Sequence, residues 1–397
     1  MYCFCSKKIF QSFVFLLMIT PAIAQHTIVY AEDAAGKISG NEAGIYFKRI
    51  DAVKNLNKAK AASLKKCLAA QLKIFYSDPL FNPPKGFNAR TSFGIDTDPF
   101  AKTVSFPPCS FHFDFYYLNK DDKTGGIKTL MDGTSVGMET NAVEHFFSQV
   151  GNFWKDCSDA KFPLFFEQLP VTDSTSDYIE MDFKKYGYAH IAPNKPFRII
   201  KRNDKPLFIP LSRKEFLQFL IAQKKFQISE YEKTIADLQK NVKETEETLK
   251  NPPSYLNEST KKALADGNVL AQKNITKTQN EIKSFQAKIQ EYESVINAMS
   301  PQEAVSPARI DENKTVPDFY DLKRLVPAGK MEGVGLYKVN PDYYDNSATA
   351  PGAQVIFVYY NLPNLSVFEK TQFNYLEKKT MDIFNHLDYH ALKMSMR

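Results

Sequence analysis

The sequence predicts an α+β protein, a mixed sheet-and-helix body interrupted by a long antiparallel two-helix coiled-coil hairpin. Three observations predict this fold. Apolar residues recur at alternating spacings of three and four over residues 213–250 and again over 259–299. The sequence Asn-Pro-Pro-Ser at 251–254 separates the two runs, and no helix continues through it. On both sides of the coil, short apolar segments bounded by Pro and Gly are typical of strands.

Isoleucine dominates one seam position of each predicted arm. These positions hold Ile221, Ile228, Ile235, Val242 and Leu249 in the first arm, and Ile275, Ile282, Ile289 and Ile296 in the second. Such a seam specifies a left-handed coiled coil, and the short connection requires the arms to pair within one chain. Arms of equal length imply paired residue numbers that add up to roughly 510. We therefore expect Ile235 near Ile275, Ile228 near Ile282 and Ile221 near Ile289.

The ends of the coil also carry helix-end signals. Ser212 and Glu215 form a capping box, in which each side chain bonds a free amide of the first turn. Leu211 and Phe216 occupy the positions of a hydrophobic staple, and Ser300-Pro301 ends the second arm. Each arm would be about 55 Å long. Because the arms are equal, the chain enters and leaves the hairpin at one place, so we expect an insertion in a globular body.

The predicted seam is imperfect. Polar side chains occupy four seam positions, and a glycine weakens the second arm: Lys224, Thr245, Asn268, Thr278 and Gly267. Three interpretations of the hairpin stay open. It is a spacer that packs only on itself, an arm that binds a protein partner, or an arm folded down on its own body.

The first residues have the pattern of a secretory signal peptide. Lys7 and Lys8 precede an apolar run over residues 9–23, and Ala22-Ile23-Ala24 is a small-x-small cleavage site before Gln25. The pattern predicts export, to the periplasm or the medium, after cleavage near Ala24. The alternative is a retained N-terminal anchor. No second apolar stretch approaches the length of a membrane span, so no transmembrane span is expected in the mature chain.

Composition limits the classes of function. The 397 residues are 43% hydrophobic and 13% aromatic, which supports a core outside the coil. Removing the signal leaves 49 of the 51 Lys and Arg against 45 Asp and Glu, so the formal charge falls from +6 to +4. The signs are mixed along the coil, which disfavours nucleic acid as a partner. Cys67, Cys109 and Cys157 remain and allow at most one internal disulfide; their spacing does not resemble a zinc site.

The segment before the hairpin predicts both helices and strands. The expected elements are a strand over 44–50, a helix over 51–76, strands over 103–106 and 111–118, a helix over 141–153, and strands over 178–183, 187–191, 197–201 and 207–209. In the strand over 111–118, Phe111, Phe113, Phe115 and Tyr117 share one face. A loop over 82–86 and a turn over 121–126 punctuate this segment.

The segment after the hairpin holds few elements. We expect a linker over 301–317, strands over 335–339 and 353–360, and one or two helices over 367–393 that bend near Asn385. The strand over 353–360 is apolar on both faces, as a central strand is. These elements are too few for a core of their own. The predicted organisation is a signal at 1–24, body at 25–211, hairpin at 212–299 and the rest of the body at 300–397.

Two stretches carry a resemblance to other proteins. They are the sequence KPLFIPLSRKEFL at 205–217, which leads into the coil, and LYKVNPDYY at 336–344, before the last strand. In these stretches the chain resembles uncharacterised exported proteins of the Bacteroidota. The resemblance implies export and carries no activity, so it assigns no catalytic residue.

Two clusters are candidates for chemistry. His386-x-Asp388-x-His390 would share a metal if the backbone were extended, but its surroundings predict a helix, which favours surface or helix-end histidines. His112 and Asp114 lie on the strand face opposite the phenylalanines. They are either an acid–base pair or the wet face of a half-buried sheet, and the second interpretation is favoured.

Other motifs are weaker. Asp96, Asp98, Asp121 and Asp122 lack the Gly and Glu of a calcium loop, and Gly333-x-Gly335 lacks the rest of a dinucleotide motif. Asp114 with Glu139 or Glu144 would suit a glycosidase only at the right separation. The pairs Tyr343-Tyr344 and Tyr359-Tyr360 would stack on a sugar if exposed, but core packing is favoured.

The sequence therefore assigns no catalytic, cofactor-binding or metal-binding residue. Nucleophile elbow, phosphate-binding loop and HExxH motifs are absent from it. The favoured hypothesis is an exported, non-enzymatic protein whose hairpin binds a protein partner or sets a distance. The alternatives are a ligand-binding module with its site in the body, and a hydrolase.

Overall fold

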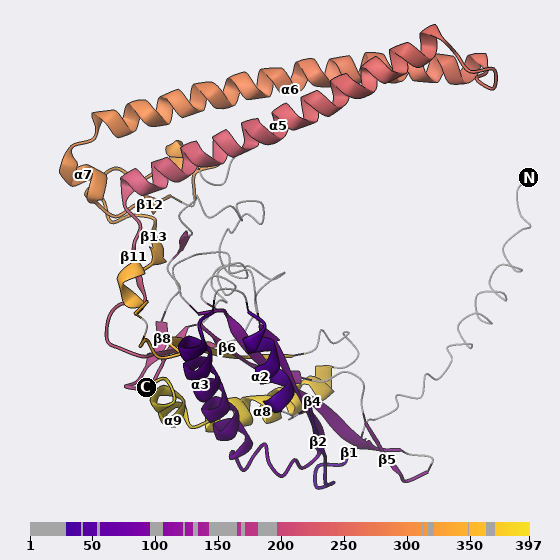
Figure 1. The fold of residues 1–397 in the computed structure, drawn as a ribbon. Coiled ribbons are helices and arrows are strands. Elements are labelled where there is room, and N and C mark those ends of the chain that lie inside the picture. Colours follow the sequence, from indigo (N-terminus) through magenta and orange to yellow (C-terminus); the bar gives the residue numbers. More distant parts are fainter. Residues whose placement is uncertain are drawn as a thin grey trace, which may run out of the picture.

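One large, mostly antiparallel sheet organises the body (Figure 1). The computed structural model describes residues 29–40, 43–53, 56–95, 106–121, 124–129, 134–142, 165–167, 171–181, 197–311, 313–316, 321–347, 349–362 and 370–397. Within them the sheet has the strand order β2-β3-β4-β6-β14-β10-β9-β8, and β1 and β5 also pair with β4. The pair β2–β3 is parallel and the others are antiparallel. The predicted α+β class is confirmed.

The strands have these bounds: β1 Val29–Tyr30, β2 Ile38–Ser39, β3 Phe87–Ile95, β4 Cys109–Lys120, β5 Ile127–Thr129, β6 Thr134–Thr140, β8 Val171–Ser174, β9 Ile179–Met181, β10 Phe197–Lys201 and β14 Val355–Asn361. Strand β14 follows the hairpin in sequence, yet it lies between β6 and β10, which precede it. Six of its seven residues are buried, as expected for a central strand. The sheet is therefore built from both flanks of the hairpin.

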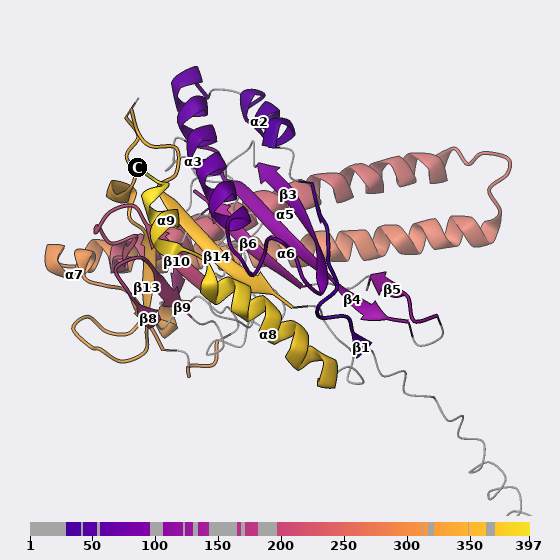
Figure 2. The same ribbon diagram turned by 90° about the horizontal axis from the view of Figure 1, so that it is seen from below.

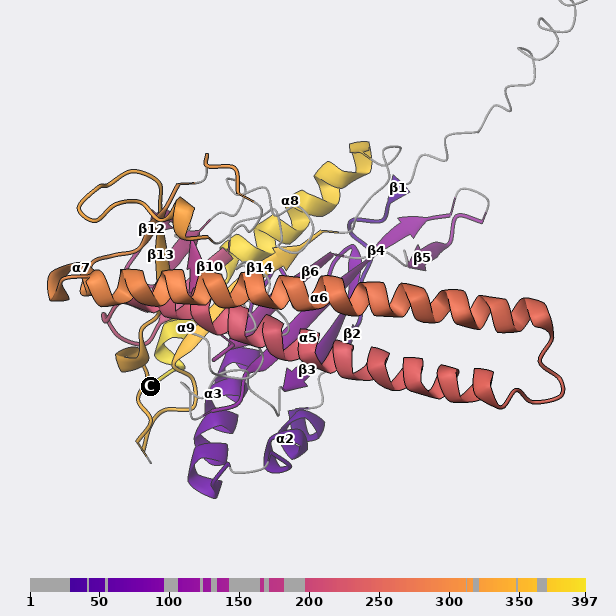
Figure 3. The same ribbon diagram turned by 90° about the horizontal axis from the view of Figure 1, so that it is seen from above.

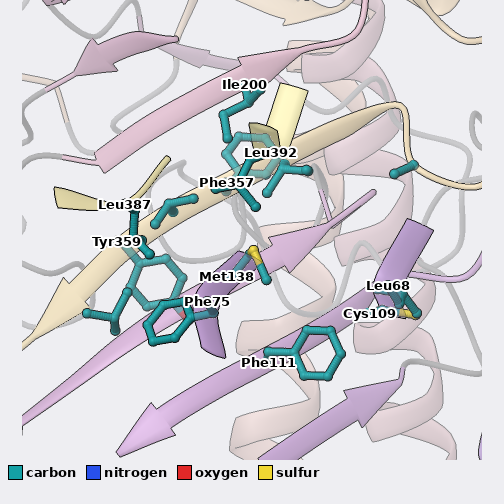
Figure 4. Close-up of a cluster of buried hydrophobic side chains, with 14 of the residues drawn as sticks. Leu68, Phe75, Cys109, Phe111, Met138, Ile200, Phe357, Tyr359, Leu387 and Leu392 are labelled. Atoms are coloured by element: carbon teal, nitrogen blue, oxygen red, sulfur yellow. The ribbon is translucent and has the colours of Figure 1, made fainter. Parts of the chain in front are cut away.

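Helices cover one face of this sheet (Figure 2). They are α3 (Lys58–Tyr76), α8 (Lys370–His386) and α9 (Tyr389–Met394), with α2 (Ala43–Asp51) beside α3. The predicted aromatic face of β4 is fully buried against them, and the Phe75 ring of α3 stacks on Phe113 with centroids 3.5 Å apart. Figure 4 shows part of this core, in which Met138 and Phe357 of the central strands lie near Leu387 and Leu392.

A smaller sheet connects the body to the hairpin. Strand β13 (Val334–Val339) pairs with β11 (Phe208–Pro210), β12 (Arg309–Ile310) and β7 (Phe165–Glu167). Tyr337 and Val339 pack against the core of the large sheet, whereas Leu336 is buried in a second core with the base of the hairpin. A short helix, α7 (Pro301–Val305), and two 3₁₀ turns, η3 (Leu322–Arg324) and η4 (Pro341–Tyr343), complete this region. The small sheet therefore contributes side chains both to the core of the large sheet and to the core at the base of the hairpin.

The hairpin has the predicted arms. Helix α5 spans Arg213–Lys250 and α6 spans Glu258–Ala298, and the capping box of Ser212 and Glu215 is present. The two helices run side by side from the small sheet, and their tip extends beyond the body (Figures 1 and 3). Their 38 and 41 residues correspond to roughly 60 Å. None of the described helices is long and apolar enough to cross a membrane.

Contacts between the arms agree with the predicted register. The Asn268 side-chain amide donates to the Val242 carbonyl at 3.4 Å, and these numbers add up to 510. The Lys224 ammonium lies 4.6 Å from the centre of the Phe285 ring, and the Tyr231 ring stacks on the same ring at 5.6 Å. Those pairs add up to 509 and 516. The first lies within one turn of helix of the predicted register, whereas the second differs from it by six residues, which is more than one turn. The seam residues Ile235, Val242, Ile275 and Ile289 are buried.

Three predicted elements are wrong. Residues 44–50 lie in helix α2 and not in a strand; Arg49 donates to the Phe93 carbonyl at 2.7 Å, a tertiary contact that the local pattern does not encode. The helix expected over 51–76 begins only at Lys58, because Asn57 caps it. The linker expected over 301–317 contains α7, capped by Ser300, and strand β12.

Other predictions lie wholly or almost wholly outside the described residues. They are the signal at 1–24, the strands over 103–106 and 187–191, and the helix over 141–153. The bend expected near Asn385 is present as a boundary between two helices, because α8 ends at His386 and Asp388 caps α9.

Replacing Ile235 with aspartate should open the distal half of the hairpin. Ile235 is buried in the seam, and losing a buried isoleucine costs about 2–5 kcal/mol before the charge is counted. We expect hydrogen exchange to accelerate over residues 236–275, while residues 213–224 at the base keep their protection. Ala236→Asp is the matched control, because Ala236 is exposed. Equal loss of protection at residues 213–224 would contradict the expectation that the distal half opens while the base stays closed.

Candidate functional site

The base of the hairpin is held by charged side chains as well as by its core. Lys338 of β13 pairs with Glu215, and Arg213 donates to the Val326 carbonyl and lies 3.4 Å from the Glu303 carboxylate. Burial opposes ionisation of Glu215, but Lys338 and the hydrogen bonds of Ser212 together hold the pKa of this carboxyl below its ordinary value. The direction in which the arm leaves the body is therefore fixed by the small sheet.

Apolar side chains are exposed at the far end of the arm. Tyr255 in the turn is 82% exposed, and Val269 and Leu270 on the outer face of α6 are 69% and 59% exposed. These three residues, named here the distal apolar residues, lie outside the buried seam. Large exposed apolar side chains on a projecting element are available for contact with a partner surface. Sequence reasoning assigned the hairpin a partner but did not single out these residues.

The cluster His386-x-Asp388-x-His390 does not converge. Nδ1 of His386 lies 2.8 Å from Asp78, and Nδ1 of His390 lies 3.1 Å from Asp177, while Asp388 accepts from the Ala391 amide as the cap of α9. Within the described residues, no three His, Cys, Asp or Glu side chains are placed to hold a metal ion. The histidines lie at or near helix ends, as the favoured interpretation expected.

A groove of about 600 Å³ lies beside His386, between the end of α3 and α9. Its wall includes Lys73, Ser77, Asp78, His386 and Asp388. Sequence reasoning missed this site, because it used Asp78 only as the end of a helix. The partners Asp78 and His386 are 308 positions apart, so no local pattern connects them.

The groove does not contain an activated serine. The Ser77 hydroxyl donates to the Lys73 carbonyl at 2.8 Å, and the Ser395 hydroxyl donates to the Leu392 carbonyl at 2.6 Å. A serine nucleophile requires its hydroxyl to bond a base instead. Neither of these two hydroxyls is therefore bonded to a base.

The pair His112 and Asp114 lies on the half-buried face of β4, opposite the aromatic core. Asp114 stands across from Arg90 of β3, and burial raises the pKa of Asp114 although His112 and Arg90 oppose the shift. Among the described residues, no hydrogen bond joins His112 to Asp114. His112 and Asp114 therefore lie on the solvent-facing side of a half-buried sheet, which is the interpretation that the sequence favoured.

The separation expected of a glycosidase pair is not met by Asp114 and Glu139. Asp114 lies opposite Ser135 on β6, and Glu139 is four residues farther along that strand. Four residues span about 13 Å, whereas glycosidase carboxylates lie about 5–9.5 Å apart. The Glu139 carboxylate instead accepts from the buried Tyr359 hydroxyl at 2.9 Å. Glu144 lies outside the described residues.

The remaining motifs either have structural roles or lie outside the described residues. Asp121 pairs with Lys128 across a turn, while Asp96, Asp98 and Asp122 lie outside the described residues. Gly333 has a φ of +71°, and a Cβ there would lie 2.2 Å from the Ile310 carbonyl oxygen. All four members of the tyrosine pairs at 343–344 and 359–360 are buried, so they do not form a stacking surface.

The described cysteines are buried thiols. Cys67 and Cys109 are both free, and burial raises the pKa of each. Raised thiol pKa values reduce the thiolate that nucleophilic or metal chemistry requires. Cys157 lies outside the described residues.

Comparison with known proteins supplies no relative: no family model, no curated protein and no solved structure matches the chain.

Proposed function

We propose that this protein is exported and that its hairpin is an arm that holds a protein partner at its tip, away from the body. The proposal assigns no catalytic residue and no cofactor. The exposure of the distal apolar residues is the observation that carries it, because the rest of the apolar hairpin pattern is used in the seam or at the base.

The construction of the arm supports this role. Its base is rigidly built, with Phe216, Leu217 and Leu220 fully buried against the small sheet. The distal part of the arm has fewer buried apolar residues, namely Ile235, Val242 and Ile275. An arm that only set a distance would have no need of large exposed apolar side chains at its end. Exposed apolar side chains of this kind favour contact with an apolar surface of another protein.

The sequence at residues 1–24 supports export. A mature chain that begins at or near Gln25 would leave the hairpin and body outside the cytoplasm. Mass spectrometry of the exported protein reads this N-terminus directly. An intact Met1 on the exported chain would contradict cleavage.

Site-specific photo-crosslinking in the cells that produce the protein tests the partner. A benzophenone side chain at Tyr255 or Val269 is expected to give a crosslinked adduct with one protein. The same group at Glu246, an exposed position on the polar part of α5, should not. Ile127 is the matched apolar control, because it is 51% exposed on strand β5 of the body.

Each outcome decides between interpretations. An adduct at Val269 that disappears with Tyr255→Lys would support partner binding. Identical adducts at Ile127 would show general adhesion of apolar residues and contradict a specific tip. The absence of adducts at both distal positions would favour the spacer interpretation, in which the length of the arm matters and its surface does not.

A further inference from the structure

We infer that the groove between α3 and α9 is a binding site for a small zwitterion with an apolar side chain, either a free apolar amino acid or a short peptide. This inference concerns the body and is independent of the partner proposed for the hairpin. It rests on three features of the groove: two opposite charges that are not paired, an oriented histidine, and an apolar wall.

The first feature is the pair of charges. Lys73 of α3 and Asp388 at the start of α9 both line the groove and are both exposed. Neither has an ion-pair partner in the part of the chain that the structure describes, and the two do not pair with one another. One oxygen of Asp388 accepts from the Ala391 amide at 2.8 Å. A ligand that carries a carboxylate and an ammonium group would satisfy both charges.

The second feature is His386. Asp78 is almost fully buried, with its side chain 4% exposed, and its two oxygens accept from the Leu80 amide and from Nδ1 of His386, both at 2.8 Å. Because an ionised carboxylate only accepts hydrogen bonds, Nδ1 carries the proton. Nε2 then remains on a ring that is half exposed on the groove wall. Asp78 therefore fixes the ring and leaves Nε2 for a ligand.

The third feature is the lining between these polar groups. Ile74, Pro79 and Ala391 contribute apolar surface, and the volume of about 600 Å³ is typical of small-molecule sites. Lys73 and Asp388 place one formal charge of each sign on the groove wall, and these two charges cancel. A groove with separated but balanced charges and an apolar wall complements a zwitterion better than a simple anion or cation.

Calorimetric titration of the full mature chain tests this with matched probes. Leucine and dileucine are the two zwitterions, and they distinguish a free amino acid from a peptide. Leucinamide and the amide of dileucine lack the carboxylate, and N-acetylleucine and N-acetyldileucine lack the ammonium group. We expect one zwitterion to bind at millimolar concentration and its two singly charged analogues to bind roughly tenfold more weakly, since hydrogen bonds to charged groups are the strong ones.

Charge-removing variants assign the two ends of the ligand. Lys73→Gln should lose the preference for the zwitterion over the analogue that lacks the carboxylate. Asp388→Asn should lose the preference for the zwitterion over the analogue that lacks the ammonium group. Asparagine caps helices as well as aspartate does, so Asp388→Asn keeps α9. His390→Gln is the control, because His390 pairs with Asp177 outside the groove wall.

The inference would be overturned if neither zwitterion binds, or if its singly charged analogues bind as tightly. It would also be overturned if Lys73→Gln and Asp388→Asn leave the preferences for the zwitterion unchanged, or if His390→Gln removes those preferences equally. Circular dichroism of each variant confirms that the fold is retained, so that a loss of binding is read as a loss of the contact.

Discussion

Replacing Gly352 with alanine is expected to destabilise the body by about 3 kcal/mol, the upper end for overpacking by a single methyl group. A Cβ at position 352 would lie 2.3 Å from both the Cα and the amide nitrogen of Leu64 in helix α3. Those are backbone atoms of a helix whose buried residues form the core, so no flexible side chain is available to move aside. Gly352 is also held by Ser63, whose hydroxyl accepts from its amide at 2.8 Å, and by Asn141, whose side-chain amide donates to its carbonyl at 2.7 Å.

The same substitution in the hairpin is the control. Gly267 lies inside α6, and a Cβ there would have no heavy atom within 4 Å. Alanine is a better helix former than glycine by about 1 kcal/mol, so Gly267→Ala should stabilise the distal arm. Chemical denaturation followed by circular dichroism compares the two variants. Equal midpoints for Gly352→Ala and the parent protein would show that α3 shifts freely on the sheet.

Replacing Arg198 with methionine should cost about 3 kcal/mol, the lower end for a buried pair, because it breaks a mostly buried ion pair from one side. Arg198 of β10 donates to Glu180 of β9 at 2.9 Å and to the Asn385 side chain at 2.8 Å. Its guanidinium also lies within 4.4–4.7 Å of the ring centres of Tyr178, Phe384 and Tyr389. The residue therefore joins the edge of the large sheet to both C-terminal helices.

A second substitution separates the charge from the packing. Glu180→Gln in the Arg198→Met background removes the unpaired carboxylate and should recover part of the lost stability. Arg90→Met is the control, because Arg90 is exposed on β3, and surface changes of this kind usually stay within about 0.5 kcal/mol. Thermal unfolding measures all of these variants. A double variant as unstable as Arg198→Met alone would show that ring contacts, and not the carboxylate, account for the loss.

The two proposals place different activities at opposite ends of the molecule. The hairpin base and the small sheet fix an arm that exposes three apolar side chains in its distal part, whereas the groove lies on the helical layer of the body. Since neither proposal uses residues of the other, the crosslinking and calorimetric experiments succeed or fail independently.

The hairpin was predictable from the sequence because every signal that defines it is local. The seam repeats within a few residues, the Ser212 capping box is complete within one turn, and the break at 251–254 forces the reversal. The same holds for the alternating face of β4, whose aromatic residues are all buried. Predictions of this kind need only the period of the backbone and the positions of proline.

Tertiary structure decided what depends on residues that are distant in the chain. Helix α2, expected as a strand, is joined to Phe93 of β3 by a bond from Arg49, and its short sequence is ambiguous without that contact. The partner of His386 is Asp78, which lies near the start of the body. The insertion of β14 between β6 and β10 likewise joins residues on opposite sides of the hairpin. Periodicity determined the arm, whereas the sheet order and the groove exist only because long-range packing brings their residues together.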